Sequence, residues 1–233
     1  MTLVARYDRW VAVAPIATVA IFAGFFAYIR LAPRQTPAGQ PALVQLTPEG
    51  LHSLVDVFNA QRDRARLLVL LSPTSGACRQ GASAIQSLAA EVPGSLSIFV
   101  VWEPVVKTDF DGPPTTRTLA RISDPRAVQF WDPHRLVSAA LLQALRAVPW
   151  RLEPDLTQST VVSDFVGVYP AGTEWTGALP FPAYLTVPVA RQIDGVRQVL
   201  RTLAQHSFED GRHHVPPGEY RTANAARCFA HSL

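Results

Sequence analysis

Ser72, Ser75 and Cys78 form the clearest chemical pattern in this 233-residue sequence. They follow the apolar run Leu67–Leu71, which is typical of a buried strand, and Cys78 begins a stretch with helical periodicity. A thiol in the first turn of a helix is favoured as thiolate by the helix dipole and by free N–H groups. Disulfide exchange at such a site needs an attacking thiol and a resolving thiol. The spacing Ser75-x-x-Cys78 offers one thiol and, in the other place, a hydroxyl that cannot attack without a base.

Both positions also have a purely structural interpretation. We expect Ser75 to be the N-cap of the following helix, because no Ser-His-Asp arrangement accompanies it. We expect Cys78 to pack against the preceding strand as a small apolar side chain, with a lone reactive thiol as the alternative. The second cysteine, Cys228, is free, bridges Cys78 or bridges a partner. Two cysteines exclude a disulfide-dense scaffold and a four-cysteine zinc site.

Two further groups of polar residues could bind ligands. The first has side chains able to ligate a metal: His213, His214, Cys228 and His231. Their spacing matches no standard zinc site, so we predict neither a metal nor another cofactor. The second group is acidic and follows a second apolar run: Glu103, Asp109 and Asp111. These acids would lie at the carboxyl edge of a parallel sheet, where ligand sites gather, but we expect them in a solvated loop.

Composition and charge exclude several classes of protein, and one uncharged stretch predicts a membrane anchor. It is 48% hydrophobic and 17% charged, which excludes disorder, and its net charge is +3. The basic residues, all arginine except Lys107, form no run, so nucleic acid is not an expected partner. Residues 10–29 contain no charge and are long enough to cross a bilayer as a helix. We predict an uncleaved single-pass anchor, with a cleaved signal peptide as the alternative.

Five segments follow from the pattern of the chain. Residues 1–9 are a short N-terminal tail, 10–29 the anchor, 30–46 a Pro/Gln/Ala-rich tether, 47–205 a globular domain and 206–233 a polar tail. Within the domain we expect a helix from Thr47, a strand at 67–71, a helix at 77–91 and a strand at 96–102. Strand, helix and strand within forty residues predict a parallel βαβ unit. Proline-capped helices after Ser123 and Asp132, a hairpin at 160–175 and a helix at 189–205 complete the prediction.

The order of these elements resembles the thioredoxin-like fold. The resemblance rests on LLVLLSPTSGAC, on SLSIFVVWEP and on the hairpin with its C-terminal helix, and it covers residues 48–205. The stretches VVWEPVVKTDF and RISDPRAVQFWDP are similar to uncharacterised bacterial thioredoxin-like proteins. The family carries Cys-x-x-Cys where this chain has Ser75 and Cys78, and a proline where it has Val161–Asp164. The resemblance implies a three-layer α/β domain whose dithiol site is degenerate.

These inferences together predict a bacterial inner-membrane protein with its domain in the periplasm. The partners expected are membrane lipid, through residues 10–29, and integral membrane proteins. The leading hypothesis is a non-catalytic structural or assembly subunit of a membrane complex, for which respiratory or photosynthetic electron transfer is one candidate setting. The alternative is a membrane-tethered thiol–disulfide oxidoreductase or redox sensor that uses Cys78, with or without Cys228. A third hypothesis is a metal-handling chaperone that uses the His/Cys tail.

Overall fold

A six-stranded mixed sheet forms the centre of the molecule. The computed structural model describes residues 17–24, 27, 33–92, 94, 96–147 and 160–210. The strands are β1 (Val44–Gln45), β2 (Ala65–Leu71), β3 (Leu96–Trp102), β4 (Ala127–Trp131), β5 (Phe165–Tyr169) and β6 (Tyr184–Thr186). Their order in the sheet is β1-β4-β3-β2-β5-β6. The first four are mutually parallel, whereas β5 runs antiparallel to both β2 and β6.

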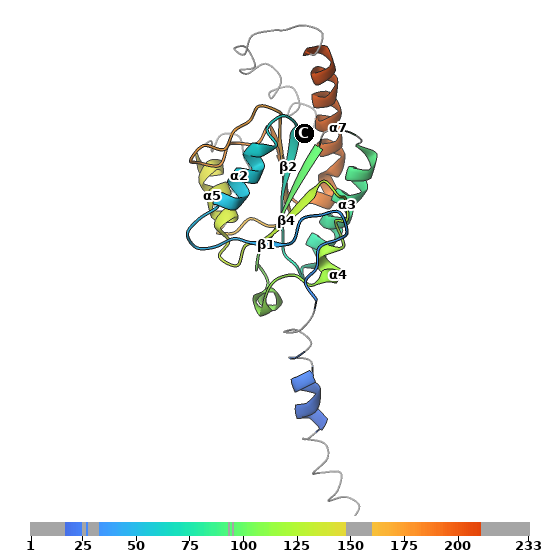
Figure 1. Cartoon of the computed structure of the whole chain (residues 1–233), viewed down its shortest axis with the longest axis vertical. Helices are drawn as coiled ribbons and strands as arrows, with labels where there is room; N and C mark the ends of the chain where they lie inside the picture. Colours follow the sequence, from blue (N-terminus) through green and yellow to red (C-terminus); the bar gives the residue numbers. More distant parts are fainter. Residues whose placement is uncertain are drawn as a thin grey trace, which may run out of the picture.

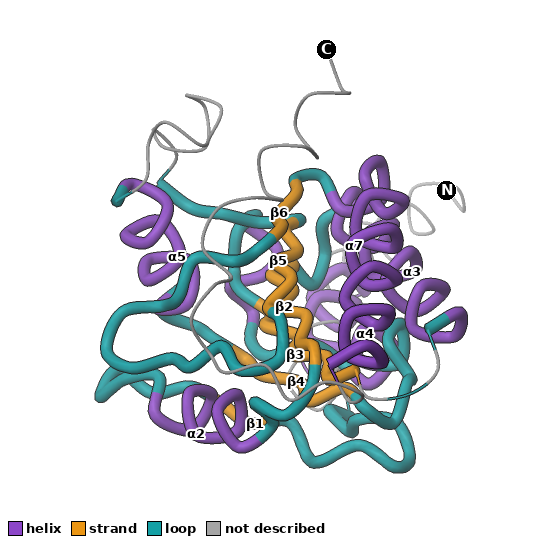
Figure 2. Tube along the Cα trace, turned by 90° about the horizontal axis from the view of Figure 1, so that it is seen from above, coloured by secondary structure: helices purple, strands orange, loops and turns teal. Residues whose placement is uncertain are grey.

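Helices cover both faces of this sheet (Figures 1 and 2). They are α2 (His52–Ala60), α3 (Gly76–Glu91), η1 (Lys107–Asp111), α4 (Thr116–Leu119), α5 (Leu136–Arg146) and α7 (Val189–Asp210). Helices α3, α4 and α7 lie on one face, and α2 and α5 lie on the other (Figure 2). The predicted α/β class is therefore confirmed, with three layers of helix, sheet and helix.

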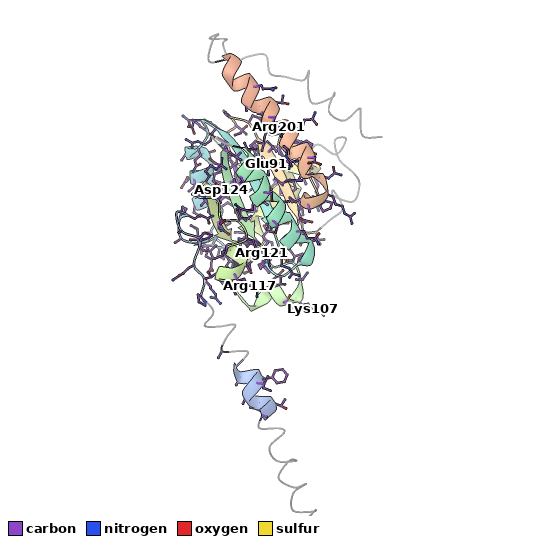
Figure 3. The ribbon with its side chains drawn as sticks, turned by 90° about the vertical axis from the view of Figure 1, so that its right-hand side faces the viewer. Glu91, Lys107, Arg117, Arg121, Asp124 and Arg201 are labelled. Carbon is purple, nitrogen blue, oxygen red and sulfur yellow. The ribbon has the colours of Figure 1, made fainter. Side chains whose placement is uncertain are left out.

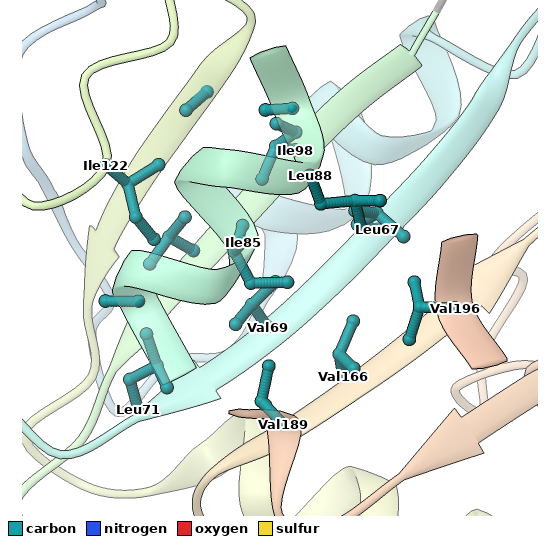
Figure 4. Close-up of a cluster of buried hydrophobic side chains, with 14 of the residues drawn as sticks. Leu67, Val69, Leu71, Ile85, Leu88, Ile98, Ile122, Val166, Val189 and Val196 are labelled. Atoms are coloured by element: carbon teal, nitrogen blue, oxygen red, sulfur yellow. The ribbon is translucent and has the colours of Figure 1, made fainter. Parts of the chain in front are cut away.

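Strand β2 carries apolar side chains on both faces of the sheet, so helices must cover both faces. Leu67, Val69 and Leu71 point into the core beneath α3 and α7 (Figure 4), and the alternate residues Leu68 and Leu70 point into the core beneath α2 and α5. All five side chains are inaccessible to solvent. Burying a leucine or valine side chain stabilises a fold by roughly 1.5–3 kcal/mol, so this central strand contributes to both cores. A continuous apolar run predicted this double burial.

Three predicted elements differ from the structure. The segment after Ser123 leads into strand β4, not into a helix, because Ala127–Trp131 pair in parallel with both β3 and β1. Strand β5 pairs with β6, which lies beyond the expected hairpin. Helix α2 begins after Leu51 because Thr47–Gly50 form a turn in which Gly50 has φ +136°. A cis peptide bond joins Val187 to Pro188 between β6 and α7.

Residues 33–46, which the sequence assigned to the tether, lie against the domain. Thr116 N donates to the carbonyl of Pro33 (2.8 Å), and Gln40 Nε2 donates to the carbonyls of Ile122 and Asp124 (2.8 Å each). Gln129, buried in β4, donates to Gln40 Oε1 (2.7 Å). Val44–Gln45 then join the sheet beside β4. Among the described residues, contacts with the domain thus extend back to Pro33, beyond the expected boundary of Thr47.

The predicted anchor falls only partly within the described residues. Residues 17–24 are helical, and Val19, Ile21 and Phe22 are about 70% exposed. Among the described residues, no helix combines the length and the apolar character needed to cross a membrane.

Candidate functional site at the carboxyl edge of the sheet

The carboxyl ends of β2, β3 and β4 meet at one edge of the sheet, here called the carboxyl edge. Ser72, Glu103 and Asp132 directly follow these three strands, and all three side chains are buried. Glu103 N donates to Leu71 O and Asp132 N donates to Trp102 O (2.9 Å each), so the three positions lie side by side. In α/β sheets this edge is the usual location of ligand sites. It carries the Ser75–Cys78 pair and the buried acids discussed below, including Asp164, because β5 runs antiparallel to β2 and begins at this edge.

Cys78 lies in the first turn of α3 and is 1% exposed. It packs in the same core as Leu71 and Val189, as the sequence predicted. Burial raises the pKa of the Cys78 thiol, and the nearby Asp164 carboxyl raises it further. Backbone hydrogen bonds at Ser72 and Asp164 and the Ser75 hydroxyl lower the pKa, but they do not offset burial. The thiol is therefore protonated and shielded, in contrast to a reactive thiolate at an open helix terminus.

Ser75 is partly exposed and occupies the N-cap position of α3, as predicted. Its side chain, however, makes no capping hydrogen bond to the helix backbone. The hydroxyl hydrogen-bonds to Cys78, and this contact lowers the pKa of the thiol. The residue that orders this turn is Ser72, whose Oγ accepts a hydrogen bond from Ser75 N (3.2 Å). The sequence thus identified the right position for Ser75 but not the role of Ser72.

Asp109, in η1, joins the loops after β2 and β3. Its Oδ2 accepts hydrogen bonds from Ser72 Oγ (2.6 Å), Val105 N (2.9 Å) and Val106 N (3.0 Å). Its Oδ1 accepts from the backbone N (2.9 Å) and Oγ1 (2.7 Å) of Thr74. Burial raises the pKa of the carboxyl, but these donors together lower it below its ordinary value. We call this arrangement the Asp109 network.

Glu103 and Asp132 form a second acidic group, the carboxyl pair, at the N-terminus of α5. Asp132 Oδ2 accepts from Val137 N (2.8 Å), and Glu103 Oε1 accepts from Ser138 N (2.9 Å). Burial raises the pKa of both carboxyls. The pKa of Glu103 rises well above its ordinary value, because Asp132 adds charge repulsion to the effect of burial. Glu103 Oε2 is buried and no hydrogen-bond donor reaches it, so burial and the neighbouring Asp132 favour the protonated form of Glu103.

Asp164 is a third buried acid, in the turn that precedes β5. It adopts a left-handed backbone (φ 55°) and its carbonyl accepts from Val189 N (3.1 Å). Its Oδ1 is buried without a partner, and burial raises the pKa of the carboxyl. A Cβ at Gly81 of α3 would lie 2.5 Å from this oxygen, so only glycine fits opposite it. Asp164 stands in the region where the resembled family has proline.

The structure corrects the prediction for the acidic residues. Glu103 and Asp109 are each 1% exposed, and neither belongs to a solvated loop. The side chain of Asp111 lies outside the described part of η1, as do four other candidates: His213, His214, Cys228 and His231. Asp132, Asp164 and Ser138 were not identified as site residues from sequence. The Asp132-Pro133 pair was the one available signal, because it predicted a helix cap.

The comparisons with known proteins leave the family open. No protein-family model matches this chain, and no curated protein matches it. Among the described residues, no three His, Cys, Asp or Glu side chains converge closely enough to hold a metal ion. What the edge offers chemically is a shielded thiol at Cys78, a partly exposed hydroxyl at Ser75 and acids engaged with the backbone.

Proposed function

We propose that this protein is a membrane-anchored, non-catalytic structural or assembly subunit built on a degenerate thioredoxin-like domain. The element order supports the fold assignment: β2, α3 and β3 form a parallel βαβ unit, and antiparallel β5 and β6 lead into α7. Strand β4 is an addition between β1 and β3. Residues 10–29 supply the anchor in this proposal, and the domain lies in the periplasm.

The burial of Cys78 is the observation that carries the proposal. Dithiol exchange begins with an exposed thiolate at the helix N-terminus. Here the partly exposed Ser75 stands in that position, and the thiol at Cys78 is 1% exposed with a raised pKa. The hydroxyl of Ser75 contacts Cys78, and because the pKa of that thiol is raised, it does not act as a base toward the hydroxyl. An α/β domain whose exposed nucleophile is replaced in this way acts through its surface, since a fold can be kept while its chemistry is lost.

Purification from native membranes in mild detergent tests the subunit role. A tagged full-length chain should co-purify with a stoichiometric set of integral membrane proteins. A Cys78→Ala variant is the matched control and should retain the same set, because the thiol is not used. Recovery of the protein as a lone monomer would contradict the proposal.

Thiol reactivity separates this proposal from the oxidoreductase alternative. In a Cys228→Ser background, Cys78 should resist alkylation at pH 8 in the folded chain and react fully in denaturant. Rapid alkylation of the folded chain, with a pH midpoint below that of an ordinary thiol, would instead favour the redox enzyme or sensor.

A further inference from the structure

The place where the chain enters the domain limits how far the domain can stand from a membrane. Pro33 is fixed to α4 through the hydrogen bond from Thr116 N, and Gln35 N donates to Thr116 Oγ1 (2.9 Å). The guanidinium of Arg34 lies against Gly112, directly after η1. Figure 1 shows α4 at the end of the domain where the chain enters. The carboxyl edge and the entry point therefore lie at the same end of the domain.

Only three residues separate the predicted anchor, which ends at Ile29, from Pro33. Even a fully extended chain spans at most about 14 Å over that interval. A free tether of residues 30–46 would have allowed about 60 Å. The headgroup layer of a bilayer is itself about 5–8 Å thick, and surface charges act over roughly 8–10 Å in physiological salt. The end of the domain that contains Pro33 thus stays within electrostatic range of lipid headgroups.

The solvent-facing charge near the entry point is basic. Lys107 and Arg117 are exposed and Arg34 is partly exposed, and no ion pair is found for them among the described residues. Figure 3 shows Lys107 and Arg117 toward one end of the domain and Arg201 toward the other. The acids Glu103, Asp109 and Asp132 are buried at this end, whereas η1 also contains Asp111 and the exposed Glu49 follows β1 at the same edge. Val106, 38% exposed, adds an apolar side chain beside Lys107.

We propose that Arg34, Val106, Lys107 and Arg117 form a basic surface that docks on the anionic headgroups of the membrane holding the anchor. The inference rests on the proposed anchor at residues 10–29. Each basic side chain near an anionic membrane surface favours the docked state about fivefold. Docking turns the carboxyl edge, with the partly exposed Ser75, toward the bilayer. A protein partner can then reach that edge only at the membrane surface, whereas the opposite end of the domain is open to soluble partners.

Energy transfer to headgroup-labelled lipid measures the docked orientation in the full chain. In a Cys228→Ser background, a donor dye is attached at Ala120→Cys beside α4 or, as the matched position, at Ala171→Cys after β5. Both alanines are exposed. Vesicles contain either 30% phosphatidylglycerol in phosphatidylcholine or phosphatidylcholine alone. We expect strong transfer from position 120 and weak transfer from position 171, and a larger difference in the anionic vesicles.

Charge reversal supplies the decisive comparison. Lys107→Glu with Arg117→Glu should lower the ratio of docked to undocked molecules at least about 25-fold. The control Arg62→Glu with Arg201→Glu changes the net charge by the same amount at exposed sites outside the basic surface. It should leave energy transfer unchanged. Equal transfer from positions 120 and 171, or transfer insensitive to both lipid charge and reversal, would overturn the docking proposal. The proposal would also be overturned if position 120 crosslinked to a membrane protein in native membranes while energy transfer to lipid showed no dependence on lipid charge.

Failure of the anchor has a separate signature. A chain that does not float with vesicles after an alkaline carbonate wash lacks a membrane-inserted segment, and both proposals then fall. A chain that floats but shows no preferred orientation contradicts only the docking of the basic surface.

Discussion

Asp109 and Glu103 are equally buried, at 1% exposed, yet their environments shift their pKa values in opposite directions. Five hydrogen bonds reach the two oxygens of Asp109. A single backbone N–H, from Ser138, reaches Glu103, and a second acid adjoins it. Burial alone therefore does not decide whether a carboxyl is charged. Donors directed at the carboxyl lower its pKa and a neighbouring acid raises it, so the balance of both with burial sets the direction of the shift.

This contrast assigns different roles to the two acids. Asp109 is ionised and fixes the backbone of both loops, so it determines the shape of the carboxyl edge. Glu103 is held neutral beside Asp132 at a cost in stability, because ionisation would place a second charge in the core. Arg66 offers a parallel at the opposite end of β2: this inaccessible cation donates to three backbone carbonyls, of Phe58, Pro170 and Thr173 (2.8–3.0 Å). Asp109 and Arg66 thus stay charged in the interior because backbone groups form hydrogen bonds with them.

Removal of the Asp109 carboxyl should have the largest effect. Asp109→Ala leaves Ser72, Thr74 and two backbone N–H groups without acceptors, so the free energy of unfolding should fall by about 3–5 kcal/mol. Chemical denaturation of the full chain in detergent measures it. Because the pKa of Asp109 is lowered, its contribution is complete above the unfolded value of 3.8 and is lost as pH falls through the folded pKa. An alanine variant as stable as the parent would contradict the network.

Filling the space beside Asp164 should have the next largest effect. Gly81→Ala places a methyl group 2.5 Å from Asp164 Oδ1 and 3.2 Å from Val189 Cβ. We expect a loss of about 1–3 kcal/mol, because either α3 or the β5 turn must shift. Gly76→Ala is the matched control in the same helix, since its Cβ would meet only the Arg79 side chain at 3.7 Å. Equal melting temperatures of the two variants would show that Asp164 does not abut Gly81.

The two serines of the loop provide a matched pair of substitutions. Ser72→Ala removes a donor to Asp109 and an acceptor for Ser75 N, and should cost about 1–2 kcal/mol. Ser75→Ala removes a partly exposed hydroxyl that caps no backbone group, and should change stability by less than about 0.5 kcal/mol. Thermal denaturation of both variants gives the ranking. The reverse ranking would restore Ser75 as the capping residue.

Replacing the Glu103 carboxyl with an amide should raise stability by a smaller amount. Glu103 binds its proton more tightly in the folded chain than in the unfolded chain, whose ordinary pKa is 4.5. Wild-type stability should therefore decline as pH rises from about 4.5 toward the folded pKa. Glu103→Gln keeps an acceptor for Ser138 N and removes this decline, with a gain of about 1 kcal/mol at neutral pH. Denaturation between pH 4 and 9 tests it, and parallel pH profiles for variant and parent would show that Glu103 is ionised.

The local hydrophobic pattern was sufficient to predict the elements whose periodicity lies within their own residues. The run Leu67–Leu71 predicted a strand buried on both faces, and the apolar spacing after Cys78 predicted α3 and the burial of that thiol. These elements were predictable because each one's hydrophobic period is contained within its own residues. Strand β4 was not, because Asp124-Pro125 resembles a helix start, and Ala127–Trp131 become a strand only by pairing with β1 and β3.

The sequence by itself determined the α/β class, the parallel βαβ unit and the absence of a second cysteine at position 75. Tertiary structure alone decided that residues 33–46 pack on the domain, since Gln40 finds its partners more than eighty positions away. It also decided the states of Asp109 and Glu103, which share the same neighbourhood in the chain. Their donors come from Ser72, Thr74 and Ser138, on segments that only the sheet brings together. The local groups Val105 N and Val106 N also reach Asp109, but no local spacing encodes the contacts from Ser72, Thr74 and Ser138.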